Sequence, residues 1–149
     1  MDVIKGCITI FLFVNTGVLK ASNGILLYRG IDTRQKQNLS MWGFSMRELS
    51  YEELLVMDLQ SIPERKQELE TIADPAWLHL RKRQLADLER LLDHLEENDR
   101  FLIEELVINR KQARFLTQQT EMTVQSIYAA RQQIIMKLCS MRYGAVYHP

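Results

Sequence analysis

The chain is poor in the residues from which catalytic, metal and phosphate-binding sites are made. Its 149 residues include two cysteines, three histidines and six glycines, and five of the glycines precede residue 45. Cys7 and Cys139 lie far apart and form no CxxC pair, which argues against a zinc site. No histidine has a cysteine or serine at a useful spacing, and no glycine-rich phosphate loop occurs. We therefore expect no enzymatic activity, no metal ion and no cofactor, in a reducing cytosol.

Long hydrophobic runs are also missing. The apolar segment CITIFLFV lies in an uncharged stretch of 14 residues between Lys5 and Lys20. A helix needs roughly 18–20 residues to cross a bilayer. Lys5 before an apolar run fits a signal peptide, but no cleavage site of the A-x-A type follows it. We expect a cytoplasmic protein of a bacterial host cell, with no membrane partner.

Residues 1–45 differ in composition from the rest, and we expect them to form an N-terminal appendage. Their Asn-Thr-Gly and Asn-Gly turns favour a β-meander with strands near 8–14, 17–20 and 25–29. Disorder of the appendage is a second interpretation. In a third, translation begins at Met46, because the RELSYEELL run that follows resembles a natural N-terminus opening into a capped helix. The native protein would then lack the appendage.

The net charge of zero conceals a segregation of charge along the chain. Residues 1–49 carry a net +3, residues 50–108 carry −8, and residues 109–149 carry +5 from six bases and one acid. The six bases are Arg110, Lys111, Arg114, Arg131, Lys137 and Arg142. A basic end on a dipolar chain favours contact of that end with nucleic acid.

Residues 46–96 are expected to form an acidic helical region. Ser50 opens a capping box, and Pro63, which is tolerated only in the first turn of a helix, favours a second helix start. The pair Asp74-Pro75 repeats the start signal for a long helix that we expect to reach Glu96.

The long helix carries a stripe of leucines at heptad-like spacing: Leu78, Leu85, Leu88, Leu92 and Leu95. This stripe, over residues 78–95, fits either the seam of a homodimer or burial inside the chain's own helical domain. The basic run Arg81-Lys82-Arg83 on the same helix fits either a solvated face or a contact with DNA or an acidic partner.

Residues 97–144 are expected to form a helix-turn-helix domain, followed by a tail at 145–149. A first helix at 100–108 would turn several apolar side chains to the core: Phe101, Leu102, Leu106 and either Val107 or Ile108. Between Lys111 and Met141, helical periodicity indicates two amphipathic helices joined by a polar break.

The second of these helices, at about 123–141, has a predicted start and a predicted buried side. Thr123 is its expected N-cap, because a threonine hydroxyl there can accept a hydrogen bond from a free amide of the first turn. Its buried stripe would consist of Ile127, Ile134, Ile135 and Leu138. The chain as a whole therefore predicts a mainly α fold: a helical bundle ending in a helix-turn-helix, with an N-terminal appendage that is either β or disordered.

Three segments carry a resemblance to a known family: LLDHLEENDRFLIEEL (91–106), FLTQQTEMTVQSIY (115–128) and RQQIIMKLCSMRYG (131–144). Together they resemble the region-four helix-turn-helix of bacterial sigma factors, in the reduced form found in phage transcriptional regulators of the ArpU and RinA type. The resemblance covers residues 88–144. The family favours a small aliphatic pair where this chain has Leu116 and Thr117, leucine at Thr120 and glycine at Glu121.

The expected DNA contacts lie on the second helix and just before the turn. Gln125 suits an adenine edge, Val124 and the Thr123 methyl suit a thymine methyl, and Ser126 lies beside them. Tyr128 and Arg131 would hold phosphates. A backbone clamp of Arg110, Lys111 and Arg114 would bring the phosphate contacts to roughly four to six, which makes affinity depend steeply on salt.

These patterns predict a sequence-dependent transcriptional regulator of phage or prophage type that binds double-stranded DNA through its recognition helix in the major groove. Since positions 124, 125 and 128 lack arginine and lysine, specificity would be modest and helped by dimerisation or by RNA polymerase. Two alternatives remain open. The chain fits a phage packaging or assembly protein similar to a small terminase subunit, and it fits a helical protein-interaction module without DNA binding.

Overall fold

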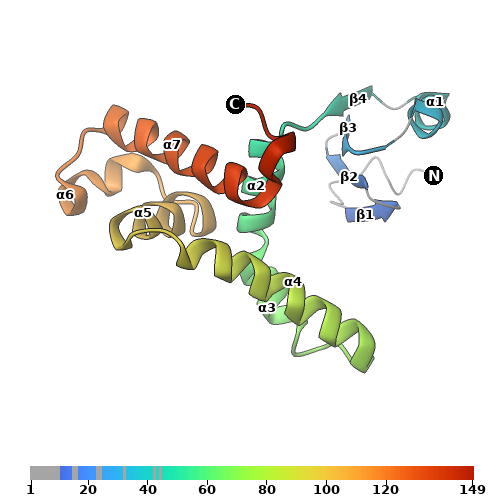
Figure 1. Cartoon of the computed structure of the whole chain (residues 1–149), viewed down its shortest axis with the longest axis horizontal. Coiled ribbons are helices and arrows are strands. Elements are labelled where there is room, and N and C mark those ends of the chain that lie inside the picture. Colours follow the sequence, from blue (N-terminus) through green and yellow to red (C-terminus); the bar gives the residue numbers. More distant parts are fainter. Residues whose placement is uncertain (1–10, 15–16, 23–24, 32, 42, 44) are drawn as a thin grey trace. The chain divides into compact units, whose positions relative to one another are not determined.

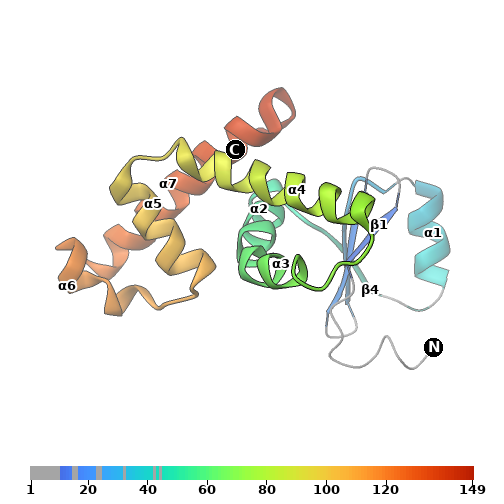
Figure 2. The same ribbon diagram turned by 90° about the horizontal axis from the view of Figure 1, so that it is seen from below.

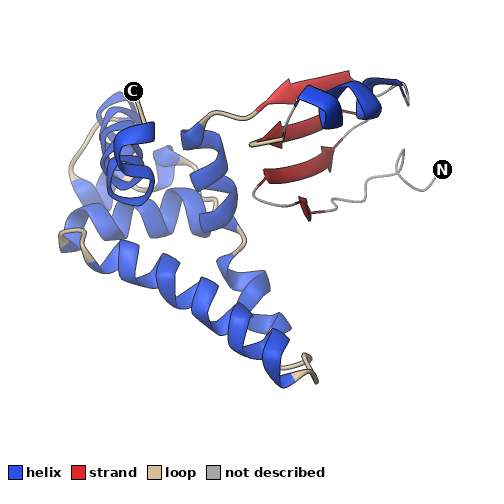
Figure 3. Ribbon diagram, turned by 45° about the vertical axis from the view of Figure 1, so that its right-hand side comes forward, coloured by secondary structure: helices blue, strands red, loops and turns tan. Residues whose placement is uncertain are grey.

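The computed structural model describes residues 11–14, 17–22, 25–31, 33–41, 43 and 45–149. The chain divides into two units, residues 1–50 and residues 51–149. The strands lie in the first unit and the second is helical (Figure 3), which confirms the predicted mainly α fold with an N-terminal appendage. The hydrophobic core of the second unit contains residues from both of the predicted segments, 46–96 and 97–144.

Over its described residues, the first unit is a four-stranded sheet with one helix. Its elements are β1 (Phe11–Val14), β2 (Gly17–Ser22), β3 (Ile25–Arg29), α1 (Thr33–Met41) and β4 (Ser45–Glu48). The first three strands form an antiparallel meander, and β4 pairs parallel with β3 through the register Leu26 to Met46. The predicted meander is confirmed over these strands, and residues 8–10 of its first strand lie outside the described residues. Helix α1 and strand β4 were not predicted from the sequence. A start of translation at Met46 stays a prediction.

The second unit is a bundle in which the long helix α7 packs on α2, α4 and α5 (Figure 1). Figure 2 shows α3 alongside α4, with which it is in contact. Its α-helices are α2 (Tyr51–Gln60), α3 (Ile62–Glu68), α4 (Pro75–Asp93), α5 (Glu97–Ile103), α6 (Thr117–Thr120) and α7 (Val124–Tyr143). A π-helical turn, η2 (Glu104–Ile108), continues α5, and two 3₁₀ turns, η3 (Ala113–Phe115) and η4 (Gly144–Val146), precede α6 and follow α7.

The helix starts fall where the local signals place them. α3 carries its proline in the first turn, where a missing amide costs nothing. Asp74 caps α4 by accepting a hydrogen bond from the Ala76 amide at 2.9 Å. The end of this helix was predicted less well, because α4 stops at Asp93 rather than at Glu96. Helix ends depend on packing as much as on local sequence.

The leucine stripe of α4 is used inside the chain. Leu85, Leu88, Leu92 and Leu95 are buried in the core of the second unit, while Leu78 is half-buried. They pack in the same cluster as the fully buried Leu55, Leu59, Ile103, Ile135 and Leu138. Of the two uses predicted for the stripe, the structure shows burial in the chain's own domain. These leucines are therefore not free to form a seam with a second copy, which would need another face of α4.

The helix predicted at 100–108 has the predicted buried residues Leu102, Leu106 and Val107, but the prediction was wrong at Phe101. α5 begins at Glu97, and Phe101 is 36% exposed instead of buried. The buried positions are Leu102, Ile103, Leu106 and Val107, whose spacing defines one face of a helix. Phe101 lies one residue, or about 100°, outside that face. Sequence periodicity allowed either face, and packing against α7 selects this one.

Candidate nucleic-acid interface

The helix-turn-helix segment, residues 113–143, consists of η3, α6, a turn and α7. Its first arm is shorter than predicted, a 3₁₀ turn followed by a four-residue helix. Leu116 in this arm and Ile127 in α7 are both fully buried and anchor the arms in the core. The Thr120 hydroxyl donates to the Leu116 carbonyl at 2.7 Å, as threonine does on a helix. Figure 1 shows α6 beside the start of α7, at one end of the bundle.

The turn has a defined backbone. Glu121 is left-handed, with φ 55°, a conformation that glycine adopts more readily than other residues. Two residues later, Thr123 is extended and its hydroxyl oxygen accepts a hydrogen bond from the Ser126 amide at 3.1 Å. The predicted N-cap is therefore confirmed. It starts α7 at Val124 and orients the first turn of the helix.

The first turns of α7 present the predicted base-reading residues to solvent. Thr123, Gln125 and Ser126 are exposed, Val124 is 38% exposed and Tyr128 is 53% exposed. At 100° per residue around the helix, Gln125 lies about 160° from the buried Ile127, whereas Ser126 and Tyr128 each lie about 100° from it. The buried stripe of Ile127, Ile134, Ile135 and Leu138 is confirmed as predicted.

Arg131 lies elsewhere on the helix than the sequence analysis placed it. It follows Ile127 by four residues and precedes Ile135 by four, so it shares their side of α7. Its side chain is half-buried, whereas the analysis expected it at the exposed edge. The guanidinium therefore lies at the flank of α7, beside Val124 and Tyr128, rather than on its outer surface.

Two of the six bases in the C-terminal segment are already paired within the chain. Lys111 forms an ion pair with Glu105, and its amide also donates to the Glu105 carbonyl at 2.9 Å. Arg142 forms an ion pair with Asp58 at 2.9 Å, and Asp58 also binds Arg65 at 3.1 Å. Both cations were counted as part of the basic end, and both are neutralised by the acidic region.

The other four bases of the C-terminal segment differ from these two. Within the part of the chain that the structure describes, no carboxylate pairs with Arg110, Arg114, Arg131 or Lys137. The Arg114 guanidinium lies 4.7 Å from the centre of the Phe115 ring, which is 61% exposed. Such a contact contributes about 0.5–1 kcal/mol at an exposed site and limits the motion of the arginine. The sequence analysis missed Phe115, because nothing in the spacing of an aromatic residue marks it as exposed.

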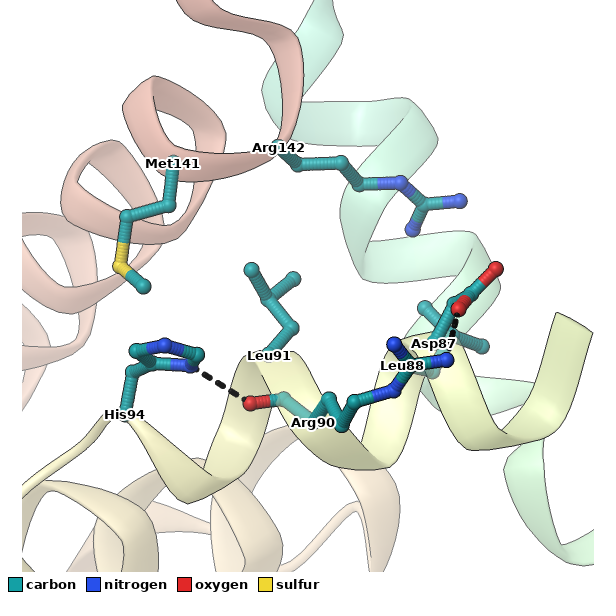
Figure 4. Close-up of a pocket in the computed structure, with 7 residues that line it drawn as sticks. All are labelled: Asp87, Leu88, Arg90, Leu91, His94, Met141 and Arg142. Carbon is teal, nitrogen blue, oxygen red and sulfur yellow. Dashed lines mark hydrogen bonds and ion pairs between the residues drawn. The ribbon is translucent and has the colours of Figure 1, made fainter.

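A separate groove of about 350 Å³ lies between α4 and the C-terminal end of α7. Figure 4 shows Leu91 and Met141 facing into it, with His94 and Arg90 along α4. The ring of His94 hydrogen-bonds the Arg90 carbonyl at 2.7 Å. Since Met141 follows Tyr128 by 13 residues, the groove lies roughly 20 Å along α7 from the base-reading end. It is not part of the nucleic-acid interface.

Comparison with known proteins gave no match: no family model, no curated protein and no solved structure matches this chain. Among the described residues, no helix combines the length and the apolar character needed to cross a bilayer. The candidate interface is therefore described by its own geometry and charge: a capped helix start with exposed polar side chains, flanked by cations that form no ion pair with any carboxylate among the described residues.

Proposed function

We propose that this protein binds double-stranded DNA by placing the start of α7 in the major groove, and that it regulates transcription as phage regulators of the kind it resembles do. One observation supports this above the others. The capped start of α7 exposes hydrogen-bonding side chains near the buried Ile127. Cations that pair with no carboxylate in the described part of the chain lie on either side, before the turn and on α7 itself. A recognition helix needs this combination, because its first turns read bases while flanking cations hold the backbone.

The reading chemistry favours A·T base pairs. The amide of Gln125 can donate to and accept from the adenine edge at once, a pairing that contributes about 1–3 kcal/mol of discrimination. Val124 and the methyl group of Thr123 offer apolar contact to a thymine methyl. Ser126 can donate or accept, although its hydroxyl already accepts from that of Thr123 at 2.9 Å.

The phosphate contacts come from both sides of the reading surface. Arg110 and Arg114 lie before the turn, and Arg131 lies on the flank of α7 next to Tyr128. With Lys111 engaged by Glu105, the clamp has three arginines, with Lys137 further along α7 as a possible fourth cation. Few contacts give modest affinity, so we propose that a second copy or RNA polymerase adds to it.

The test is a binding-site selection from random duplexes with the full chain, compared with its Gln125→Ala variant. We expect the wild type to enrich a motif with an A·T pair that the variant no longer prefers, a loss of about 5- to 150-fold at that position. Gln133→Ala, an exposed glutamine further along α7, is the matched control and should leave the motif unchanged. If the wild type is not retained on any duplex at low salt, the proposal is wrong.

A second candidate function is supported by the apolar character of the same surface. Phe115, Val124 and Tyr128 are all exposed, and aromatic residues are typical of protein interfaces. In this alternative the segment binds a protein and has no DNA affinity. Alanine at both Arg114 and Arg131 separates the two, because a DNA-binding protein would lose activity and a purely protein-binding module would keep it.

A further inference from the structure

The exposed side of α4 carries a second stripe beside the buried leucines. Trp77, Leu80, Gln84 and Leu91 fall within about 60° of one another around the helix and about 90° from the core stripe. Trp77 is 45% exposed and Leu80 is 42% exposed, while Gln84 and Leu91 are half-buried. An exposed tryptophan and leucine one turn apart favour a contact with another surface.

This stripe continues into the groove between α4 and α7. Leu88 and Leu91 line the groove on the α4 side, and Met141, 40% exposed, faces them from α7 (Figure 4). The stripe therefore spans α4 from its first turn to its last. Its length corresponds to that of a second helix lying along it.

Charges on α4 are arranged symmetrically about Gln84. This symmetry indicates that the helix lying along the stripe is α4 of a second copy of the chain. Arg81 lies three residues before Gln84 and Asp87 three residues after it, while Trp77 and Leu91 lie seven residues to either side. In an antiparallel copy with its twofold axis at Gln84, each position meets its mirror position. Arg81 would then face the copy's Asp87, and Trp77 the copy's Leu91. A parallel copy would instead place like charges opposite each other.

We propose that α4 pairs antiparallel with α4 of a second copy of this chain, with the twofold axis at Gln84. The contacts that these residues make within one chain can be replaced by contacts with the second copy. Arg81 lies 4.6 Å from the centre of the Trp77 ring and donates to the Gln84 side chain at 3.3 Å, while Asp87 pairs with Arg90 at 2.6 Å on an exposed surface. An exposed pair contributes little, so replacing Arg90 by the partner's Arg81 costs little.

The contact differs from the buried leucine stripe and is independent of DNA binding by α7. Because it involves essentially one helix from each copy, it belongs with the small interfaces, and we expect a dissociation constant on the order of micromolar. Its isologous geometry would present two helix-turn-helix segments related by a twofold axis.

Sedimentation equilibrium of the full chain from roughly 1 to 500 µM tests this pairing. We expect Arg81→Asp and Asp87→Arg each to weaken association about tenfold or more, because each places like charges opposite one another. The double variant restores opposite charges and should return to within about threefold of the wild type. Arg83→Asp makes the same charge change at an exposed position off the stripe and should have a much smaller effect.

Three results would overturn the pairing. The first is a wild-type chain that stays monomeric over the whole range. The second is equal weakening by Arg81→Asp and Arg83→Asp, which would indicate a general charge effect. The third is a double variant that stays as weak as the single ones. Circular dichroism of each variant checks that the helices are retained, and DNA retention measured in parallel shows whether Arg81 contacts nucleic acid instead of a second copy.

Discussion

The proposed DNA binding predicts a salt dependence that is set by the cations without an ion-pair partner among the described residues. Each phosphate that a protein neutralises contributes about −0.9 to the slope of log affinity against log salt. Arg110, Arg114 and Arg131 give a slope of about −2.7, and Lys137 as a fourth contact would give about −3.6. Between 50 and 200 mM salt, the affinity should fall by about 40- to 150-fold.

A matched pair of variants isolates the contribution of one free cation. Arg114→Ala removes a cation with no carboxylate partner among the described residues, so we expect the slope to become shallower by about 0.9. Lys111→Gln combined with Glu105→Gln removes the ion pair in the preceding turn without leaving a single charge behind. Because Lys111 is already neutralised within the chain, this double variant should keep the wild-type slope.

Fluorescence anisotropy with a labelled duplex, titrated at several salt concentrations, gives these slopes. Urea unfolding of each variant shows whether the fold is preserved. A slope near zero for the wild type would mean that the segment does not neutralise phosphates. An equal change of slope for Arg114→Ala and for the Lys111 double variant would mean that ion pairing within the chain does not select the contacts, and the reasoning from paired and unpaired cations would fail.

Three further predictions concern stability. Thr123→Ala removes the cap of α7 and should lower the free energy of unfolding by about 0.5–2 kcal/mol in urea titrations, whereas Gln133→Ala should change it little. Glu121→Gly relieves the left-handed backbone and should raise the same quantity by about 0.5–1 kcal/mol. Burial and the hydrogen bond to Glu52 raise the pKa of Tyr147 to about 12 from 10. The contribution of the protonated Tyr147 to the free energy of unfolding is therefore complete below pH 10 and is lost as the pH rises to 12. Tyr147→Phe should remove this decline in alkaline melts, and an unchanged decline would assign it to other groups.

The start of α7 shows which features of the candidate site can be predicted from local sequence. Thr123 as the cap, Ile127 as the first buried residue and Gln125 on the outer side all follow from spacing within a single helix. The side of α7 on which Arg131 lies also follows from spacing, because it is four residues from both Ile127 and Ile135, but how deeply it is buried depends on the helices packed against α7. The pairing of Lys111 with Glu105 depends on the loop at Arg110, whose left-handed backbone has no marker in the sequence.

By itself, the sequence determined the elements whose signals lie within a few residues of one another. These are the capped and proline-marked starts of α3, α4 and α7, the buried stripe of α7, and a basic C-terminal end that follows an acidic region. Such signals act through hydrogen bonds and side-chain spacing inside one helix, so they hold whatever the rest of the chain does.

Only the tertiary structure decided which of several equivalent faces is buried and which charges remain free. In the tertiary structure Phe101 is exposed and the leucines of α4 are buried in the chain's own core. Arg142 pairs with Asp58, which lies 84 residues earlier in the sequence. Each outcome depends on segments far apart in the sequence meeting in space. No local pattern specifies such a meeting, because the free energy that selects it comes from packing and desolvation over the whole core.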